Sequence, residues 1–166
     1  MNKYITKDSG KRKQYPDGMH RDITEGKPRP DLIPLNVWQA ILTAKLNHTQ
    51  NLNDAFVDFW ANPSWHELVD MLINVMPLIP NFLTRFGALL ERGAKKYTEN
   101  NWMKANSEEE MNHFKQSSFR HFAQFLDGDT DEDHALAAFG FNPMGYLHVK
   151  DKLVIRKSLL PLSKKK

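Results

Sequence analysis

The acidic segment 127–134, with the sequence Asp-Gly-Asp-Thr-Asp-Glu-Asp-His, has the greatest potential for chemistry in the sequence. Five carboxylates within seven residues repel one another unless water or a cation neutralises them. Carboxylates are the ligands that Mg²⁺ prefers, and Mg²⁺ serves phosphate chemistry. The alternative is a helix N-terminus enriched in acids that favour its dipole. The segment is not an EF-hand loop, because the Asp-x-Asp-x-Asp-Gly order and the closing Glu are missing.

A second polar segment combines cations, aromatic rings and an amide. Lys95 and Lys96 place two positive charges at the end of a predicted helix. There they either bind phosphate or only compensate the negative end of the helix dipole. Tyr97 or Trp102 has a ring that can stack on a base, and the Asn101 amide can read a base edge. Trp102 is equally suited to be a lid on the core.

A third polar segment lies inside a predicted helix. His113, Ser117 and His121 are spaced i, i+4 and i+8, so they share one helix face. Arg120 carries a planar guanidinium that fits a phosphate group. Two His ligands on one helix are typically four residues apart. The eight-residue spacing therefore favours a buried His beside a carboxylate over a metal site.

The rest of the sequence predicts the helices that position these segments. Apolar residues recur at helical spacing, and no run of alternating strands appears. Two pairs, Ser64 with Glu67 and Ser107 with Glu110, have the spacing of capping boxes. We therefore predict an all-α, single-domain bundle of about five helices. The predicted helices begin near Leu35, Ser64, Pro80, Ser107 and Asp131, and a short apolar run opens at Asn53.

The chain divides into three predicted parts. Residues 1–33 have few apolar side chains and many Gly and Pro residues, so we expect an extended or irregular N-terminal arm. Residues 34–160 form the helical domain, and residues 161–166 form a basic tail. Gly93 permits a bend, and Pro143 is expected to break or kink the last helix.

Composition and charge exclude several function classes. The 166 residues contain no Cys, which excludes disulfides, Cys-ligated metal sites and a catalytic thiol. No apolar run is long enough to span a membrane and no secretory signal is recognisable, so we expect a cytoplasmic protein. The formal charge is +4 over residues 1–30, −7 over 31–149 and +6 over 150–166. The acidic middle argues against nucleic acid as a partner.

Four motifs, taken in order, resemble the phage-type dATP/dGTP diphosphohydrolase family, which is related to the MazG-like all-α nucleotide pyrophosphohydrolases. The resemblance covers roughly residues 20–150 and implies cleavage of a purine dNTP to the monophosphate and pyrophosphate. It also implies Mg²⁺ or Mn²⁺ as cofactor, a homo-oligomer (dimer or tetramer), and the host cytoplasm if the chain is phage-encoded. The motifs are Arg29-Pro30-Asp31-Leu32-Ile33-Pro34, Gly93-Ala94-x-Lys96-Tyr97 with Asn101-Trp102, Ser117-x-x-Arg120-His121, and Gly128-Asp129-x-Asp131-Glu132-Asp133-His134 with Asn142.

The resemblance and the residue chemistry together define the candidate site. The metal ligands are expected to be Asp129, Glu132 and Asp133. The candidate catalytic residues are Glu132, His121 and His134. Glu132 is expected to bind the metal, and His121 or His134 to orient a carboxylate or to transfer a proton. The candidate substrate-binding residues are Asp31, Lys95, Lys96, Tyr97, Asn101, Trp102, Arg120 and Asn142.

A departure from the MazG-like pattern leaves alternatives open. Those enzymes carry Glu-Glu-x-x-Glu on one helix and Glu-x-x-Asp on the next, whereas Glu91 stands alone before Lys95. The alternative function is a nucleotide-binding protein that sequesters without turnover, and a partner-binding helical protein is a third possibility. An HD-type phosphohydrolase is disfavoured, because its adjacent His-Asp pair occurs only in reverse, as Asp133-His134. The apolar segment 56–78 is longer than expected and is interpreted either as an elaboration for oligomer contacts or as a sign of altered activity.

Overall fold

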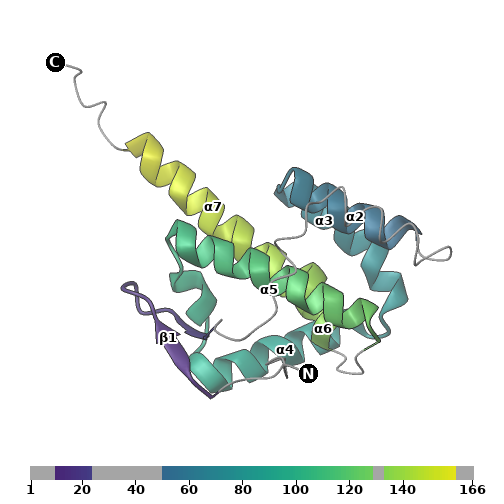
Figure 1. Cartoon of the computed structure of the whole chain (residues 1–166), viewed down its shortest axis with the longest axis horizontal. Helices are drawn as coiled ribbons and strands as arrows, with labels where there is room; N and C mark the ends of the chain where they lie inside the picture. The colour runs from purple at the N-terminus through teal and green to yellow at the C-terminus, as the bar shows by residue number, and fades with distance from the viewer. Residues whose placement is uncertain (1–9, 24–49, 129–132, 160–166) are drawn as a thin grey trace, which may run out of the picture.

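Helices dominate the computed structural model, which describes residues 10–23, 50–128 and 133–159 (Figure 1). Within these ranges, five α-helices have eleven or more residues, so the predicted all-α fold is confirmed. Their bounds are α2 Gln50–Ala61, α3 Trp65–Val75, α4 Phe82–Tyr97, α5 Glu108–Leu126 and α7 Asn142–Leu159. The shorter helical turns are η2 Met76–Leu78, η3 Asn101–Lys104, α6 Asp133–Leu136 and η4 Ala137–Phe141. The helix predicted from Leu35 lies outside the described residues.

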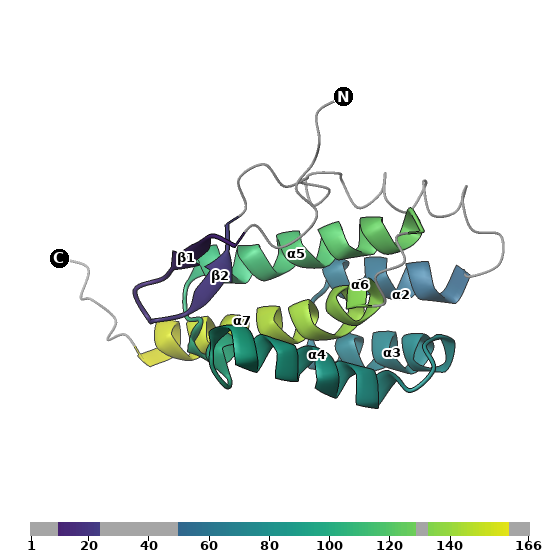
Figure 2. The same ribbon diagram turned by 90° about the horizontal axis from the view of Figure 1, so that it is seen from below.

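The long helices α5 and α7 pack along each other through the middle of the molecule (Figure 2). Helix α2 packs on α3, and α4 packs against α6. Gly145 on α7 lies against the Phe114 ring of α5, where an added Cβ would be 2.4 Å from the nearest ring carbon. Glycine at this position therefore lets the two helices approach closely.

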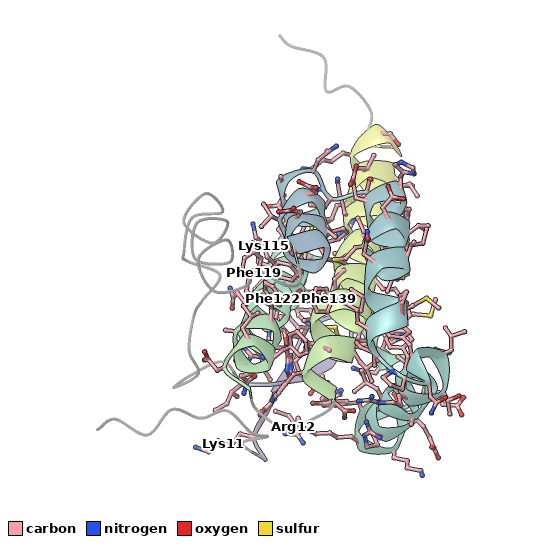
Figure 3. All side chains as sticks on the ribbon, turned by 90° about the vertical axis from the view of Figure 1, so that its right-hand side faces the viewer. Lys11, Arg12, Lys115, Phe119, Phe122 and Phe139 are labelled. Carbon is pink, nitrogen blue, oxygen red and sulfur yellow. The ribbon has the colours of Figure 1, made fainter. Side chains whose placement is uncertain are left out.

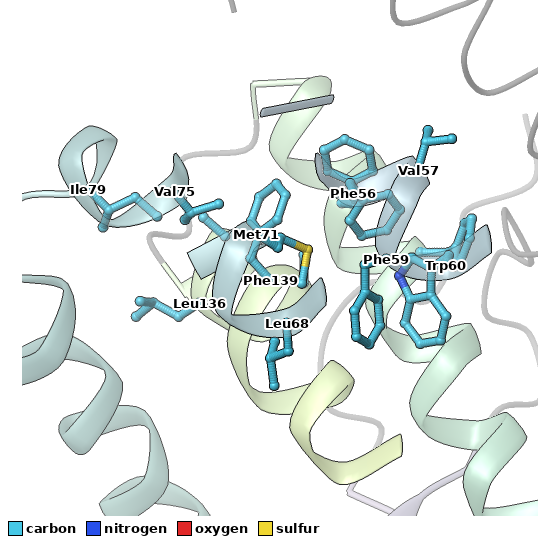
Figure 4. Close-up of a cluster of buried hydrophobic side chains, with 14 of the residues drawn as sticks. Phe56, Val57, Phe59, Trp60, Leu68, Met71, Val75, Ile79, Leu136 and Phe139 are labelled. Carbon is cyan, nitrogen blue, oxygen red and sulfur yellow. The ribbon is translucent and has the colours of Figure 1, made fainter. Parts of the chain in front are cut away.

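The main core is a cluster of aromatic rings from α2, α5 and η4. Phe56, Phe122 and Phe139 are fully buried, with ring centroids 4.0 Å apart for Phe56–Phe122 and 5.3 Å apart for Phe122–Phe139. Phe119 belongs to the same cluster (Figure 3), and Met71 of α3 packs into it beside Phe139 (Figure 4). The helical spacing of these residues points their rings inward, and their buried area is the main stabilising term of the bundle.

Helix ends follow the predicted capping rules. The Ser64 side chain accepts a hydrogen bond from the backbone N–H of Glu67, 3.1 Å long, at the start of α3. Ser107 and Glu110 form the complete capping box at the start of α5. Gly128, with φ +78°, follows the end of α5 in the left-handed conformation that glycine tolerates. These local signals fix the helix ends independently of tertiary packing.

Neither of the two predicted irregularities interrupts its helix. Helix α4 continues through Gly93 to Tyr97, and no atom lies within 4 Å of a Cβ built at Gly93, so the glycine neither ends the helix nor makes the close contact that it would permit. The backbone stays helical from Asp133 through Pro143 to Leu159, so the expected break is absent, and the irregularity is the π-helical turn η4, which ends at Phe141. Pro143 has no N–H to donate within this helical stretch, and the Ala138 carbonyl five residues earlier accepts from the Ser118 hydroxyl at 2.6 Å. A π-helical turn of this kind is frequent at functional sites.

The described part of the N-terminal arm is a β-hairpin, where extended or irregular structure was expected. Strand β1 Arg12–Gln14 pairs antiparallel with β2 His20–Asp22. The turn uses Pro16-Asp17-Gly18, and the Asp17 carboxylate accepts a bond from the Met19 N–H at 2.9 Å. The hairpin buries side chains against η3, α5 and α7. This second core consists of Tyr15, Met19, Ala105, Phe114 and Val149.

No single helix among the described residues is both long and apolar enough to cross a membrane. The pair Trp65–Leu78 and Phe82–Tyr97, bent by 109° at its junction, meets the criterion only when its two parts are taken together.

Candidate functional site

Two predicted catalytic side chains meet where α5 packs on α6. The Nδ1 atom of His121 lies 2.9 Å from the Nδ1 atom of His134, and the ring centroids are 5.2 Å apart. His134 is buried, while His121 is half-buried. A hydrogen bond between two ring nitrogens needs a proton on one and a lone pair on the other. The geometry lets one ring donate to the other, an arrangement that suits the pair to proton transfer.

Asp133 begins α6 and faces α4. Its carboxylate forms an ion pair with Arg92 of α4. The other two predicted metal ligands, Asp129 and Glu132, lie outside the described residues, as does the predicted substrate contact Asp31. Among the residues that the structure describes, no group of three or more His, Asp or Glu side chains is placed to hold a metal ion. These residues by themselves therefore do not fit a complete Mg²⁺ site.

The last turn of α4 carries the predicted cations. Lys95 forms an ion pair with Glu91 one turn earlier, 2.6 Å between Nζ and Oε1, with both side chains exposed. The hydrogen bond from Lys95 lowers the pKa of the Glu91 carboxyl. Lys96 lies 5.3 Å from the centroid of the Tyr97 ring, and Arg12 of β1 lies 5.2 Å from the same centroid. Positive charge therefore gathers around Tyr97.

Asn101 and Trp102 of η3 serve the packing of the hairpin and the core. The buried Asn101 amide bonds both backbone groups of His20: its Oδ1 accepts at 3.2 Å and its Nδ2 donates at 3.0 Å. The Trp102 ring packs edge-on against His148 at 5.1 Å and Phe141 at 6.4 Å between centroids. Trp102 therefore covers the core, as in the alternative interpretation of this residue from the sequence. Base recognition by these two side chains stays a prediction.

Asn142, at the start of α7, joins the hairpin to the helix junction. It is 1% exposed, and its Nδ2 donates to the carbonyl of Ala137 at 2.8 Å. Its Oδ1 accepts from Nη2 of Arg21, on β2, at 3.4 Å. Sequence reasoning missed Arg21, because an arm expected to be irregular offers no helix face on which to place it.

Arg120 lies on a buried face of α5. Its Nη2 donates to Oγ of Ser117, one turn earlier, at 2.9 Å. The bond holds the guanidinium in a defined orientation, as a phosphate contact requires. The predicted phosphate contact of Arg120 itself stays a prediction.

A pair of acids lies between the hairpin turn and α5, and sequence reasoning missed this pair as well. Glu110 is 1% exposed, and its Oε2 accepts from the backbone N–H groups of Asn106 and Ser107 at 3.0 Å each. Burial raises the pKa of the Glu110 carboxyl, and the neighbouring Asp17 carboxyl raises it further. The capping box of Glu110 was visible in the sequence, but its burial depends on the hairpin that covers it.

The candidate residues therefore fall into two groups. His121, His134 and Asp133 gather where α4, α5 and α6 meet. The remaining described candidates lie near the hairpin, at the end of α4, or on α5. These are Lys95, Lys96, Tyr97, Asn101, Trp102, Arg120 and Asn142.

Comparison with known families gives one match. Residues 66–151 match the family model described as dATP/dGTP diphosphohydrolase, N-terminal. The match covers just over half of the chain and includes the motifs around Gly93, Arg120 and His134, whereas the motif 29–34 lies outside it. Comparisons with curated proteins and with solved structures give no match.

Proposed function

The chain belongs to the dATP/dGTP diphosphohydrolase N-terminal family, and on this basis we propose that it hydrolyses dATP or dGTP to the monophosphate and pyrophosphate. The observation that carries the proposal is the His121–His134 contact inside the matched region. Hydrolysis needs a group that takes a proton from water, and a pair of imidazoles within hydrogen-bond distance is such a group.

The proposed reaction is attack of water on the α-phosphorus. The water oxygen forms a bond to phosphorus, the bond to the oxygen that bridges the α- and β-phosphates breaks, and pyrophosphate leaves. The proton of the water passes to the His121–His134 pair. The protein supplies orientation and positive charge, which account for most of the catalysis of phosphoryl transfer.

The predicted cations have defined roles in this proposal. Arg120, oriented by Ser117, binds a phosphate oxygen. Lys95 and Lys96 raise the positive potential at the end of α4, which attracts the polyphosphate. Tyr97 is available to stack on the base once the cations at its ring have shifted toward the phosphates.

Dependence on Mg²⁺ or Mn²⁺ is part of the proposal and rests on acids of segment 129–133. Asp133 is the described member of the expected ligand set, and Arg92 pairs with its carboxylate. Asp129 and Glu132 would have to complete the set. Such an ion, when bound, neutralises phosphate charge. Removing divalent ions with EDTA is expected to abolish hydrolysis, and activity that survives EDTA would refute the metal requirement.

The test compares the His121→Ala variant with a matched control. We expect the wild type to release pyrophosphate from dATP or dGTP, and His121→Ala to lower kcat by about 100-fold or more, the usual share of one proton-transfer group. His66→Ala, which removes an exposed His on α3, should leave kcat unchanged. Wild-type protein that binds dNTPs but releases no product would instead identify the sequestering alternative. Equal kcat values in both variants would remove the His pair from the mechanism.

A homo-oligomer, a cytoplasmic location and the absence of a nucleic-acid partner stay predictions. A second copy of the chain is the occupant we propose for the outer face of α3. There Trp65, Val69 and Ile73 are spaced i, i+4 and i+8 and expose 46%, 53% and 61% of their surface. Such a stripe suits the apolar centre of an interface that buries about 800 Å² per partner. Val69→Asp should lower the mass measured by light scattering, and an unchanged mass would exclude this face.

A further inference from the structure

Arg21 of β2 is half-buried and places its guanidinium between the hairpin and the helices. Its Cζ lies 4.6 Å from the ring centroid of Phe114 on α5 and 5.9 Å from that of Phe141 in η4. Burial lowers the pKa of the Arg21 guanidinium, which reports the cost of keeping its charge away from water. The side chain is therefore held at the junction of three elements, not extended into solvent.

Within the part of the chain that the structure describes, no salt bridge joins the Arg21 guanidinium to a carboxylate, and Asp22 acts on its charge only from a distance. Asp22, the neighbouring acid, pairs with Arg12 across the hairpin at 3.5 Å. Within the same part of the chain, the side-chain hydrogen bond of Arg21 runs from Nη2 to Oδ1 of Asn142 and is long, at 3.4 Å. A guanidinium has five N–H donors. One weak bond and two aromatic faces leave most of them available to an anion.

The surroundings of Arg21 match those expected for a phosphate site. Asn142 and Tyr97 were predicted from the sequence as substrate-binding residues, without reference to the hairpin. Asn142 bonds Arg21 directly at 3.4 Å. Arg12 adds a second cation at the Tyr97 ring. Two half-buried guanidinium groups on neighbouring strands raise the positive potential beside these residues, and this arrangement attracts a negative group.

We propose that Arg21 binds a phosphate oxygen of the nucleotide, so that the hairpin supplies part of the substrate site. The proposal rests on the proposed function for the identity of the ligand. A planar guanidinium forms two parallel hydrogen bonds to phosphate oxygens, a geometry that Lys cannot reproduce. Through the Arg21 side chain, the hairpin would thereby contribute to the same site as the candidate residues on α4 and α7.

The experiment measures binding of inorganic tripolyphosphate, and of dGTP and dATP with a non-hydrolysable α–β bridge, by calorimetry. We expect Arg21→Met to weaken both by about tenfold or more, and Arg21→Lys to weaken them by a smaller factor. Arg156→Met, which removes a surface cation on α7, is the matched control and should bind as the wild type does. The melting temperature without ligand should stay the same or rise in Arg21→Met, because a partly desolvated charge is removed while the packing on the Phe114 ring is kept.

Two results would overturn the inference. The first is an Arg21→Met protein that melts earlier but binds both ligands normally, since Arg21 would then only fasten the hairpin. The second concerns Arg21→Lys, which keeps the charge and is included in case Arg21→Met folds poorly. If Arg21→Lys binds both ligands with wild-type affinity and has the wild-type KM for dGTP and dATP, the inference is wrong. Hydrolysis by the wild type separates the two proposals. Cleavage of dNTPs with no effect of either variant refutes the role of Arg21 alone, whereas a wild type that binds neither ligand refutes the proposed function as well.

Discussion

The two clusters of buried side chains differ in what surrounds them. The main core joins Phe56, Phe122 and Phe139 in a continuous apolar contact. The second core, under the hairpin, is smaller, and polar groups accompany its apolar side chains. These polar groups are Arg21, Asn101, Glu110, His113 and Asn142.

This difference separates stability from function. Burial of aromatic surface stabilises the first cluster without requiring any partner. Burial of charged and polar groups in the second is unfavourable unless each finds a partner. Buried polar side chains also flank the main core, among them Ser117, Arg120 and His134. The second cluster differs in its Arg21 guanidinium, which has one long hydrogen bond to Asn142, so an anion can gain free energy by binding there.

The largest expected effect is on the main core. Phe122→Ala should lower the free energy of unfolding by about 3–5 kcal/mol, because it removes a buried ring and leaves a cavity. Urea denaturation measures the change. Phe125→Ala, at a more exposed position of the same helix, should cost much less. Equal losses at the two positions would contradict the assignment of the main core.

Much of the helical framework could be predicted from local sequence. The capping pairs at Ser64 and Ser107 and the stop at Gly128 act within one turn of chain, so they were visible without tertiary structure. The hairpin was not predicted, although Pro16-Asp17-Gly18 is a recognisable turn signal. Its strands are three residues each and are held by long-range contacts to η3 and α5.

The sequence allowed us to predict which residue types form the candidate site, but not which of these side chains contact each other. Family motifs indicated both His121 and His134, and the structure brings them into contact. The bond between Asn101 and His20 joins residues 81 positions apart, so the sequence could not show it, and the role of Asn101 as a base reader stays a prediction. Arg21 was missed for the same reason, since its environment comes from α5 and α7.

The second expected effect is on the attachment of the hairpin. Asn101→Ala should cost about 2–3 kcal/mol, because it leaves two backbone groups of His20 without their hydrogen bonds. Hydrogen exchange should accelerate in residues 10–23 while α5 and α7 stay protected. Asn74→Ala, which removes a single exposed bond to Asp70, is the control. Uniformly faster exchange would show that the two cores unfold together.

A smaller difference in stability between the two regions is expected at their helix caps. Ser64→Ala, near the main core, should cost about 1 kcal/mol. Ser107→Ala should cost more, about 2 kcal/mol, since the Ser107 hydroxyl also donates to the buried Glu110 carboxylate at 2.6 Å. Thermal and urea denaturation provide both values. A smaller loss at Ser107 would mean that Glu110 does not depend on that bond.

The smallest expected effect is a change in pH dependence. The folded-state pKa of Glu110 lies above its ordinary value, so its contribution to stability is fully present below that ordinary value. The contribution is lost as pH rises through the folded-state pKa. Glu110→Gln keeps the capping geometry and does not titrate. Its stability relative to the wild type should therefore increase as pH rises from the ordinary value toward neutrality, and a constant difference would contradict the raised pKa.

The most direct measurement of the central claim is hydrolysis of each of the four dNTPs in ¹⁸O-labelled water with Mg²⁺. We expect equal amounts of monophosphate and pyrophosphate from dATP or dGTP, with the label in the monophosphate alone. That result would establish attack at the α-phosphorus by a purine dNTP diphosphohydrolase. Release of inorganic phosphate or triphosphate, label in the pyrophosphate, or no product from any of the four would contradict the account.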